Sequence, residues 1–203
     1  PEIGTWKRLI ACQLPKVVRI WSACIEEGES QKPINLIIFP MANDNIIIDP
    51  IIFEEPHRIA PPFSWVGHIP FAFFLVKHHQ PRTIVELGTH SGNSYFAFCQ
   101  AVDMLDLQTK CFAVDTWQGD PQAGFYDETV YEDVFDYNQK NYKGFSTLLR
   151  KTFDEALADF EDESIDLLHI DGLHTYEAVK HDFESWLPKM STKGIILLHD
   201  TKV

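Results

Sequence analysis

The sequence lacks a surplus of positive charge. It carries 17 Lys and Arg residues against 30 Asp and Glu residues, which gives a formal net charge of −13. Proteins that grip the phosphate backbone of nucleic acids need an excess of Lys and Arg, so this balance argues against a nucleic-acid partner. A small-molecule site is compatible with it.

Cysteines are few, and long apolar runs are absent. The four cysteines, Cys12, Cys24, Cys99 and Cys111, form no Cys-X-X-Cys pair. Cys99 and Cys111 lie in apolar periodic segments, which favours reduced, buried thiols in a cytoplasmic protein over a disulfide framework. The longest apolar candidate, residues 69–76, is far shorter than the roughly 20 residues that span a bilayer, so we predict no membrane span.

From residue 63 onward, short apolar runs alternate with segments of helical periodicity. The pattern predicts strands at residues 83–87, 110–115, 146–150, 165–171 and 194–199, and helices at residues 65–79, 93–105, 129–141, 154–160 and 174–186. Such an alternation predicts an α/β fold, a Rossmann-like, doubly wound and mainly parallel sheet with helices on both faces. The 203 residues suffice for one such domain, assigned to residues 63–203, with a modest extension.

The first 62 residues differ in character and are assigned to an N-terminal extension. Residues 14–25 have roughly helical spacing of apolar side chains, which predicts a helix. Two β-branched runs, residues 34–39 and 46–52, predict a hairpin. Residues 55–62 contain three prolines and predict an extended linker.

The loop after the strand at residues 83–87 reads GTHSG. Gly88 lets the chain turn sharply beside a ligand, and Gly92 permits close packing where the next helix exposes its first N–H groups. Dinucleotide sites use GxGxxG to seat a pyrophosphate, and that spacing is absent here. S-adenosylmethionine has no phosphate, so the loop favours this cofactor over NAD. A turn that needs glycine only for its geometry is the alternative.

Polar residues also follow the other predicted strands, at the edge where such sheets bind ligands. Asp115 ends one strand, Asp171 ends another, and the pair His199-Asp200 ends the last. A carboxylate at Asp115 is placed to accept hydrogen bonds from two ribose hydroxyls. Capping of the following turn is the alternative for this residue.

Four segments carry a resemblance to a known family: residues 86–94, 111–120 (CFAVDTWQGD), 168–182 (LHIDGLHTYEAVKHD) and 194–201 (GIILLHDT). They resemble class I S-adenosylmethionine-dependent methyltransferases, in particular a bacterial group associated with glycosyltransferases and polysaccharide clusters. The resemblance covers residues 63–203. It implies S-adenosylmethionine as the cofactor and O-methylation of a sugar, a glycan or another small hydroxylated acceptor.

The resemblance also implies a role for each matching position. The cofactor pocket would include Glu86, Gly88, Thr89, Gly92, Asp115, Thr116, Trp117 and Asp154. Asp171 and His174 would be catalytic, with His174 as the general base because imidazole titrates near neutral pH. Capping of the following helix is the alternative for both residues.

The same resemblance implies a divalent metal held by Asp171, His199 and Asp200. Relatives often carry two acidic or amide groups after the last strand, whereas this sequence has His199. Magnesium prefers oxygen ligands and imidazole suits zinc, iron or manganese, so His199 weakens the case for magnesium. Assistance by a metal and its absence both stay open.

Two other functions compete with methyl transfer, because fold does not fix function. One is a metal-dependent, oxygenase-like enzyme, and the other is a non-catalytic module that binds the cofactor or a partner. The acidic, aromatic segment at residues 116–141 predicts either a lid over the acceptor or a surface helix. Relatives continue past the last strand with a helix and two closing strands, so we expect a sheet that is either truncated or unusually short. If it is truncated, residues 194–199 form an exposed edge, which predicts a homodimer or reduced activity.

Overall fold

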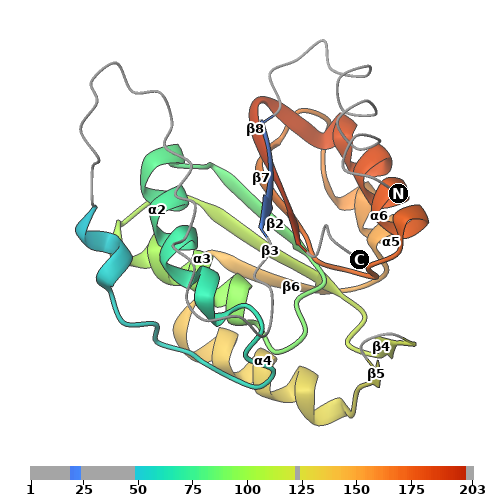
Figure 1. Cartoon of the computed structure of the whole chain (residues 1–203), viewed down its shortest axis with the longest axis horizontal. Coiled ribbons are helices and arrows are strands. Elements are labelled where there is room, and N and C mark those ends of the chain that lie inside the picture. Colours follow the sequence, from blue (N-terminus) through green and yellow to red (C-terminus); the bar gives the residue numbers. More distant parts are fainter. Residues whose placement is uncertain (1–18, 24–48, 122–123, 200–203) are drawn as a thin grey trace, which may run out of the picture.

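The computed structural model describes residues 19–23, 49–121 and 124–199. They form a six-stranded sheet in the order β1-β8-β7-β2-β3-β6, in which all neighbours are parallel (Figure 1). The strands are β1 (Arg19–Ala23), β2 (Thr83–Leu87), β3 (Lys110–Asp115), β6 (Ser146–Arg150), β7 (Ile165–Ile170) and β8 (Met190–His199), with a small antiparallel pair β4 (Gly119–Asp120) and β5 (Gly124–Phe125). The α-helices are α2 (Ile69–His79), α3 (Asn93–Met104), α4 (Glu128–Asn141), α5 (Phe153–Ala156) and α6 (Tyr176–Trp186), and the 3-10 helices are η1 (Pro50–Phe53), η2 (Val66–His68), η3 (Leu157–Asp159) and η4 (Leu187–Lys189).

Two apolar layers cover the sheet. Successive residues of a strand point to opposite faces, so Ile84 packs in the core that contains α2, α3 and α4, whereas Val85 packs in the core that contains α5 and α6. Figure 1 shows these two groups of helices on opposite sides of the strands. The predicted Rossmann-like sheet with helices on both faces is therefore confirmed.

Strand β2 lies at the centre of the topology. It pairs with β3 on one side and with β7 on the other. The chain leaves β2 toward β3 and β6, and it then returns to the other side of β2 at β7 and β8. Ligands of open α/β sheets bind at such a reversal, beyond the carboxyl ends of the strands. The gap between the ends of β2 and β7 is therefore where a site is expected.

The N-terminal segment departs from its prediction. Residues 19–23 form β1 instead of part of a helix, with Arg19 opposite Ile195 of β8. The backbone groups of β8 bind this segment, and the local helical spacing does not prevent it. The prediction that residues 194–199 form an exposed edge is therefore wrong.

The predicted hairpin is also corrected in the part that can be compared. Residues 34–39 lie outside the described residues. The described end of the second run is the 3-10 helix η1, where the side chain of Asp49 accepts a hydrogen bond from Ile51 N–H at 3.1 Å. Pro50 has no N–H for a strand ladder, so an Asp-Pro step favours this capped turn over a strand.

The proline-rich segment at residues 55–62 lies on helix α3. Asn93 accepts a hydrogen bond from Ala60 N–H at 2.9 Å and donates one to Ala60 O at 2.7 Å. Gln100 accepts a hydrogen bond from His57 N–H at 2.7 Å. Asn93 and Gln100 are both buried, so the segment is fixed to α3 through its own backbone.

Two further expectations can be compared with the structure. Cys99 and Cys111 are buried free thiols, as predicted, and Cys12 and Cys24 lie outside the described residues. None of the helices in the described ranges has both the length and the apolar character needed to cross a membrane.

Candidate functional site

A cavity of about 510 Å³ lies at the carboxyl ends of β2, β3, β7 and β8. Gly88 leaves β2 with a φ of +86°, and a Cβ at this position would lie 2.1 Å from the carbonyl oxygen of Asp171. Only glycine allows the loop after β2 and the loop after β7 to approach this closely. The two loops at the reversal of the chain thus form one continuous wall.

The structure separates the predicted site residues into two groups. The wall of the cavity contains Gly88, Thr89, Asp115, Thr116, Asp171, His174 and His199. Glu86, Gly92, Trp117 and Asp154 are described but do not line it. Asp200 lies outside the described residues, so its role as a metal ligand stays a prediction.

Asp115 holds in place the loop at residues 88–92, which we call the glycine loop. Its Oδ2 accepts hydrogen bonds from the backbone N–H groups of Thr89 at 2.8 Å and His90 at 2.9 Å. Its Oδ1 accepts one from Trp117 N–H at 2.7 Å, which is the turn-capping role weighed from the sequence. A carboxylate oxygen accepts about two hydrogen bonds, so Oδ1 keeps capacity for a ligand hydroxyl.

Two of the residues outside the wall lie directly behind it. Glu86 is fully buried, and its Oε2 is 2.8 Å from His169 Nδ1. Burial raises the pKa of Glu86 above its usual value, although the contacts with His169 and Ser94 act in the opposite direction. Trp117 is also buried and donates its indole N–H to His90 O at 2.9 Å. Both residues support the wall and do not form its surface.

Asp154 departs furthest from its predicted place in the cofactor pocket. It lies in the first turn of α5 with an exposed side chain, and its Oδ1 accepts a hydrogen bond from His181 Nε2 on α6 at 2.8 Å. The contact raises the pKa of His181. Its neighbours Thr152 and Phe153 line the cavity, so the segment reaches the site through them.

Asp171, His174 and His199 form a cluster in the wall of the cavity. His174 Nε2 and His199 Nδ1 each lie 3.1 Å from Oδ1 of Asp171. The enclosed position of Asp171 raises its pKa, but the hydrogen bond from His174 and the contact with His199 outweigh this and hold it well below its usual value. One potential ligand atom from each residue lies within 4.8 Å of the others, so the three residues fit one metal ion.

Sequence reasoning did not single out His90 and Tyr126. Their rings are stacked with centroids 4.2 Å apart, and both line the cavity. Burial, together with the charges of Asp115 and Asp120, raises the pKa of Tyr126 to about 12, so its phenol is neutral near pH 7. Burial lowers the pKa of His90. Tyr126 lies in the aromatic segment weighed as a lid, which is the signal that pointed toward it.

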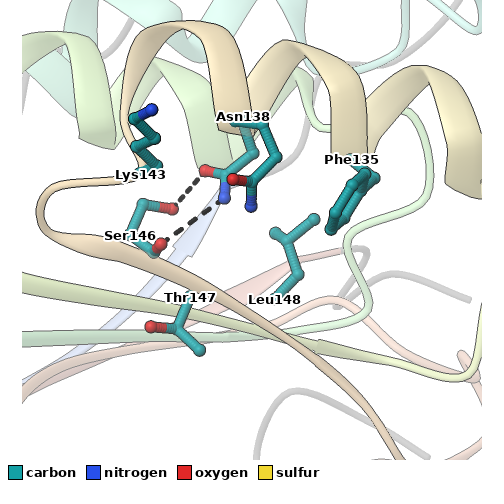
Figure 2. A pocket seen from close by; sticks show the side chains of 7 residues that line it. Phe135, Asn138, Lys143, Ser146, Thr147 and Leu148 are labelled. Carbon is teal, nitrogen blue, oxygen red and sulfur yellow. Dashed lines mark hydrogen bonds between the residues drawn. The ribbon is translucent and has the colours of Figure 1, made fainter.

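A second hollow, of about 380 Å³, lies between α4 and β6 (Figure 2). Ser146 donates a hydrogen bond to Asn138 Oδ1 at 2.5 Å, and Asn138 Nδ2 donates one to Ser146 O at 3.4 Å. Tyr95 also contacts Ser146, with 2.6 Å between their hydroxyl oxygens. These groups bind one another and leave little hydrogen-bonding capacity for a ligand, so we assign no site here.

Comparisons with known proteins match this chain to a family and to a relative. A family model described as a methyltransferase domain matches residues 85–201. The chain is similar to the uncharacterized protein y4gI of Sinorhizobium fredii (strain NBRC 101917 / NGR234), with 58% identity over 150 residues, which are 74% of this chain and 16% of y4gI.

Two solved structures share the fold. One is the SAH-bound methyltransferase PaMTH1 of Podospora anserina, with a TM-score of 0.51 and 19% identity over 64% of this chain and 51% of that chain. The other is a putative caffeoyl-CoA O-methyltransferase from Staphylococcus aureus, with a TM-score of 0.50 and 16% identity over 69% of this chain and 58% of that chain. This chain thus spans a small part of y4gI and between half and three fifths of these two proteins.

Proposed function

The chain belongs to the methyltransferase-domain family, and on that premise we propose that it transfers a methyl group from S-adenosylmethionine to a hydroxyl oxygen of a small, sugar-like acceptor. One observation carries the proposal. The glycine loop after β2, Asp115 at the end of β3 and the cluster at Asp171 line a single cavity at the reversal of the sheet. The same side chains scattered over separate surfaces would not support it.

The order of the strands suggests how the cofactor lies. Thr152 and Phe153 follow β6 and supply a side for the adenine, while Asp115 at the end of β3 supplies an acceptor for ribose hydroxyls. The amino-acid end of S-adenosylmethionine then lies over the loop that begins at Gly88. The acceptor occupies the remaining end of the cavity, near Asp171 and His199.

The Asp171–His174 pair supports base catalysis. A carboxylate only accepts hydrogen bonds, so His174 donates from Nε2 and its Nδ1 is the atom that can take a proton from the acceptor hydroxyl. S-adenosylmethionine supplies an electrophilic methyl group, and the sulfur leaves as a neutral thioether when the oxygen bonds to the methyl carbon. Asp171 stabilises the imidazolium that His174 becomes.

The same cluster fits a divalent metal as well. Asp171, His174 and His199 would hold the ion through one oxygen and two nitrogens, a donor set that favours iron, manganese or zinc over magnesium. A bound ion supplies Lewis acidity, which lowers the pKa of an acceptor hydroxyl. In that case His174 is a metal ligand, and its role as a base is lost.

One observation favours a second function. Two histidines and one carboxylate on one side of a cavity are the ligand set of many non-haem iron(II) oxygenases. A metal-dependent, oxygenase-like enzyme on this fold is therefore the second candidate. Iron in the purified protein, together with no affinity for S-adenosylhomocysteine, would favour it over methyl transfer.

Calorimetry with S-adenosylhomocysteine tests the main proposal. We expect the wild type to bind, and Asp115→Ala to bind at least about tenfold more weakly, because one charge-assisted hydrogen bond contributes roughly 1.5–3 kcal/mol. Asp154→Ala is the matched control, since its carboxylate lies outside the cavity wall. A wild type that does not bind would refute the proposal, and equal binding by Asp115→Ala would remove Asp115 from the site.

Three finer predictions rest on the sequence resemblance and composition: a glycan acceptor from polysaccharide biosynthesis, a homodimer and a cytoplasmic location. Exposed Phe63 and Phe125 are next to the lining residues Pro62, Ser64 and Tyr126, which supports an acceptor that stacks on aromatic rings. Sedimentation velocity tests the dimer, and a sedimentation coefficient of a single chain at micromolar concentration would contradict it.

A further inference from the structure

Trp65 is a buried residue of the cavity wall that no motif indicated. It is 6% exposed and precedes α2, upstream of the matched residues 85–201. Within the described part of the chain, its indole Nε1 has no hydrogen-bond partner. A buried indole N–H normally has one, and leaving it without one costs about 1–3 kcal/mol. Trp65 lines the cavity, so a ligand bound there can supply the missing acceptor.

A second buried polar group in the same wall also lacks a hydrogen-bond partner among the described residues. This group is the hydroxyl of Thr89. Next to it, helix α3 begins at Asn93, and both Asn93 and Ser94 line the cavity. The first N–H groups of a helix lack partners within the helix, and the helix dipole favours negative charge there. The wall therefore presents several donors and calls for an acceptor-rich ligand group.

The sheet order locates these donors along the cavity. Neighbouring strands lie about 4.8 Å apart, so the ends of β6 and β7 are separated by three spacings, about 14 Å. The ring of Trp65 lies 5.4 Å from that of His169 in β7 and 5.8 Å from that of Phe98 in α3. Trp65 is thus on the β7 side of β2, opposite the β3 and β6 side that carries Asp115 and Phe153.

The geometry points to Trp65 as a binding residue for the amino-acid carboxylate of the methyl donor. Its Nε1 donates one hydrogen bond, and the Thr89 hydroxyl and the N-terminus of α3 complete the subsite. The inference rests on the proposed function, which places adenine and ribose on the β6 and β3 side and hence the amino-acid end here. A carboxylate only accepts hydrogen bonds, which matches a wall of donors.

Two ligands that differ only at the amino-acid end test the inference. S-adenosylhomocysteine carries the carboxylate, and 5′-methylthioadenosine lacks the whole amino-acid group. We expect Trp65→Phe to weaken binding of S-adenosylhomocysteine by about 10- to 100-fold, the range for one charge-assisted hydrogen bond. We expect the affinity for methylthioadenosine to stay within about twofold, because no atom of that ligand reaches Nε1.

Trp186→Phe is the matched control. Trp186 is fully buried in the other core, and its Nε1 also lacks a partner among the described residues, but it does not line the cavity. This variant should leave both affinities unchanged. It therefore separates the loss of a ligand contact from the general effect of removing a buried indole.

The outcomes are distinct. Unchanged binding of S-adenosylhomocysteine by Trp65→Phe overturns the inference and includes the case in which the indole contacts the acceptor instead. Equal weakening of both ligands also overturns it, because Trp65 then only shapes the cavity. If Trp65→Phe does not fold, Thr89→Val provides the same comparison at the same subsite. Failure of the wild type to bind S-adenosylhomocysteine refutes the proposed function itself.

Discussion

The two ends of strand β7 use the same side chain in opposite ways. Asp166, near the amino end, is fully buried and accepts hydrogen bonds from Arg82 N–H at 2.8 Å and Ser191 Oγ at 2.6 Å. Its Oδ2, which accepts the hydrogen bond from Arg82 N–H, also pairs with Arg82 Nε at 3.1 Å and Lys193 Nζ at 3.2 Å. All of its capacity is taken up by the protein.

Asp171, at the carboxyl end, is bound less completely by the described residues. Both of its histidine partners approach the same oxygen, Oδ1. In the same cavity wall, Trp65 Nε1 and Thr89 Oγ1 have no partner among the described residues. The amino end of the sheet therefore stabilises the fold, whereas the carboxyl end leaves polar groups for a ligand to complete.

The largest effect should come from removing Asp171. Asp171→Ala deletes one of three grouped ligand atoms, so we expect the affinity for Co²⁺ to fall at least about 100-fold relative to the wild type, more than the loss of a supporting residue causes. A Co²⁺ titration followed by visible absorbance measures this. Asp154→Ala removes another carboxylate paired with a histidine and should leave the affinity unchanged. Equal Co²⁺ affinity in the wild type and Asp171→Ala would show that the cluster holds no metal.

Removing Asp166 should affect stability and leave ligand binding intact. Asp166→Asn removes the buried charge that accepts hydrogen bonds from Arg82 N–H and Ser191 Oγ, and we expect a loss of about 2–3 kcal/mol in the free energy of unfolding. Urea denaturation at pH 7 measures the loss. Calorimetry with S-adenosylhomocysteine should give the wild-type affinity, and a weakened affinity would contradict the division between the two ends.

The pH dependence of that loss follows from the pKa of Asp166. Burial raises this pKa, but the hydrogen bonds from Arg82 and Ser191 outweigh burial and hold it well below its usual value. A group whose pKa is lowered by folding stabilises the fold above its unfolded pKa, about 3.9, and loses that contribution as the pH falls. The difference in the free energy of unfolding between wild type and Asp166→Asn should therefore be largest at pH 7 and should become smaller below about pH 4. A gap that widens on acidification would refute this assignment.

The carboxyl edge was largely predictable because buried parallel strands leave a clear signal. The apolar runs at residues 83–87, 110–115 and 146–150 coincide with β2, β3 and β6. Once strands and helices alternate, topology alone brings the ends of β2, β3, β7 and β8 to one edge. Asp115, Asp171 and His199 were therefore found from their positions at the ends of strands.

Other features depend on contacts that the local sequence does not encode. Residues 19–23 have helical spacing, and only the free side of β8 makes them a strand. Asp154 follows two lining residues, but the first turn of α5 directs it to His181 outside the cavity. Trp65 and Tyr126 reach the cavity from segments outside the strand ends, so no spacing rule indicates them.

We expect the smallest effect from removing one buried hydroxyl at each end of the sheet, Ser191 at the amino end and Thr89 at the carboxyl end. Ser191 donates to the charged Asp166, so Ser191→Ala should lower the free energy of unfolding by about 2 kcal/mol. Thr89→Val replaces a buried hydroxyl that has no hydrogen-bond partner among the described residues by a methyl group of similar size. Without ligand, the variant should therefore be as stable as the wild type or slightly more stable. Saturating S-adenosylhomocysteine should reverse the order of wild type and Thr89→Val in a thermal melt, because only the wild-type hydroxyl meets the ligand. A loss of about 2 kcal/mol in ligand-free Thr89→Val would mean that the protein itself satisfies this hydroxyl, and the contrast between the two ends would not hold there.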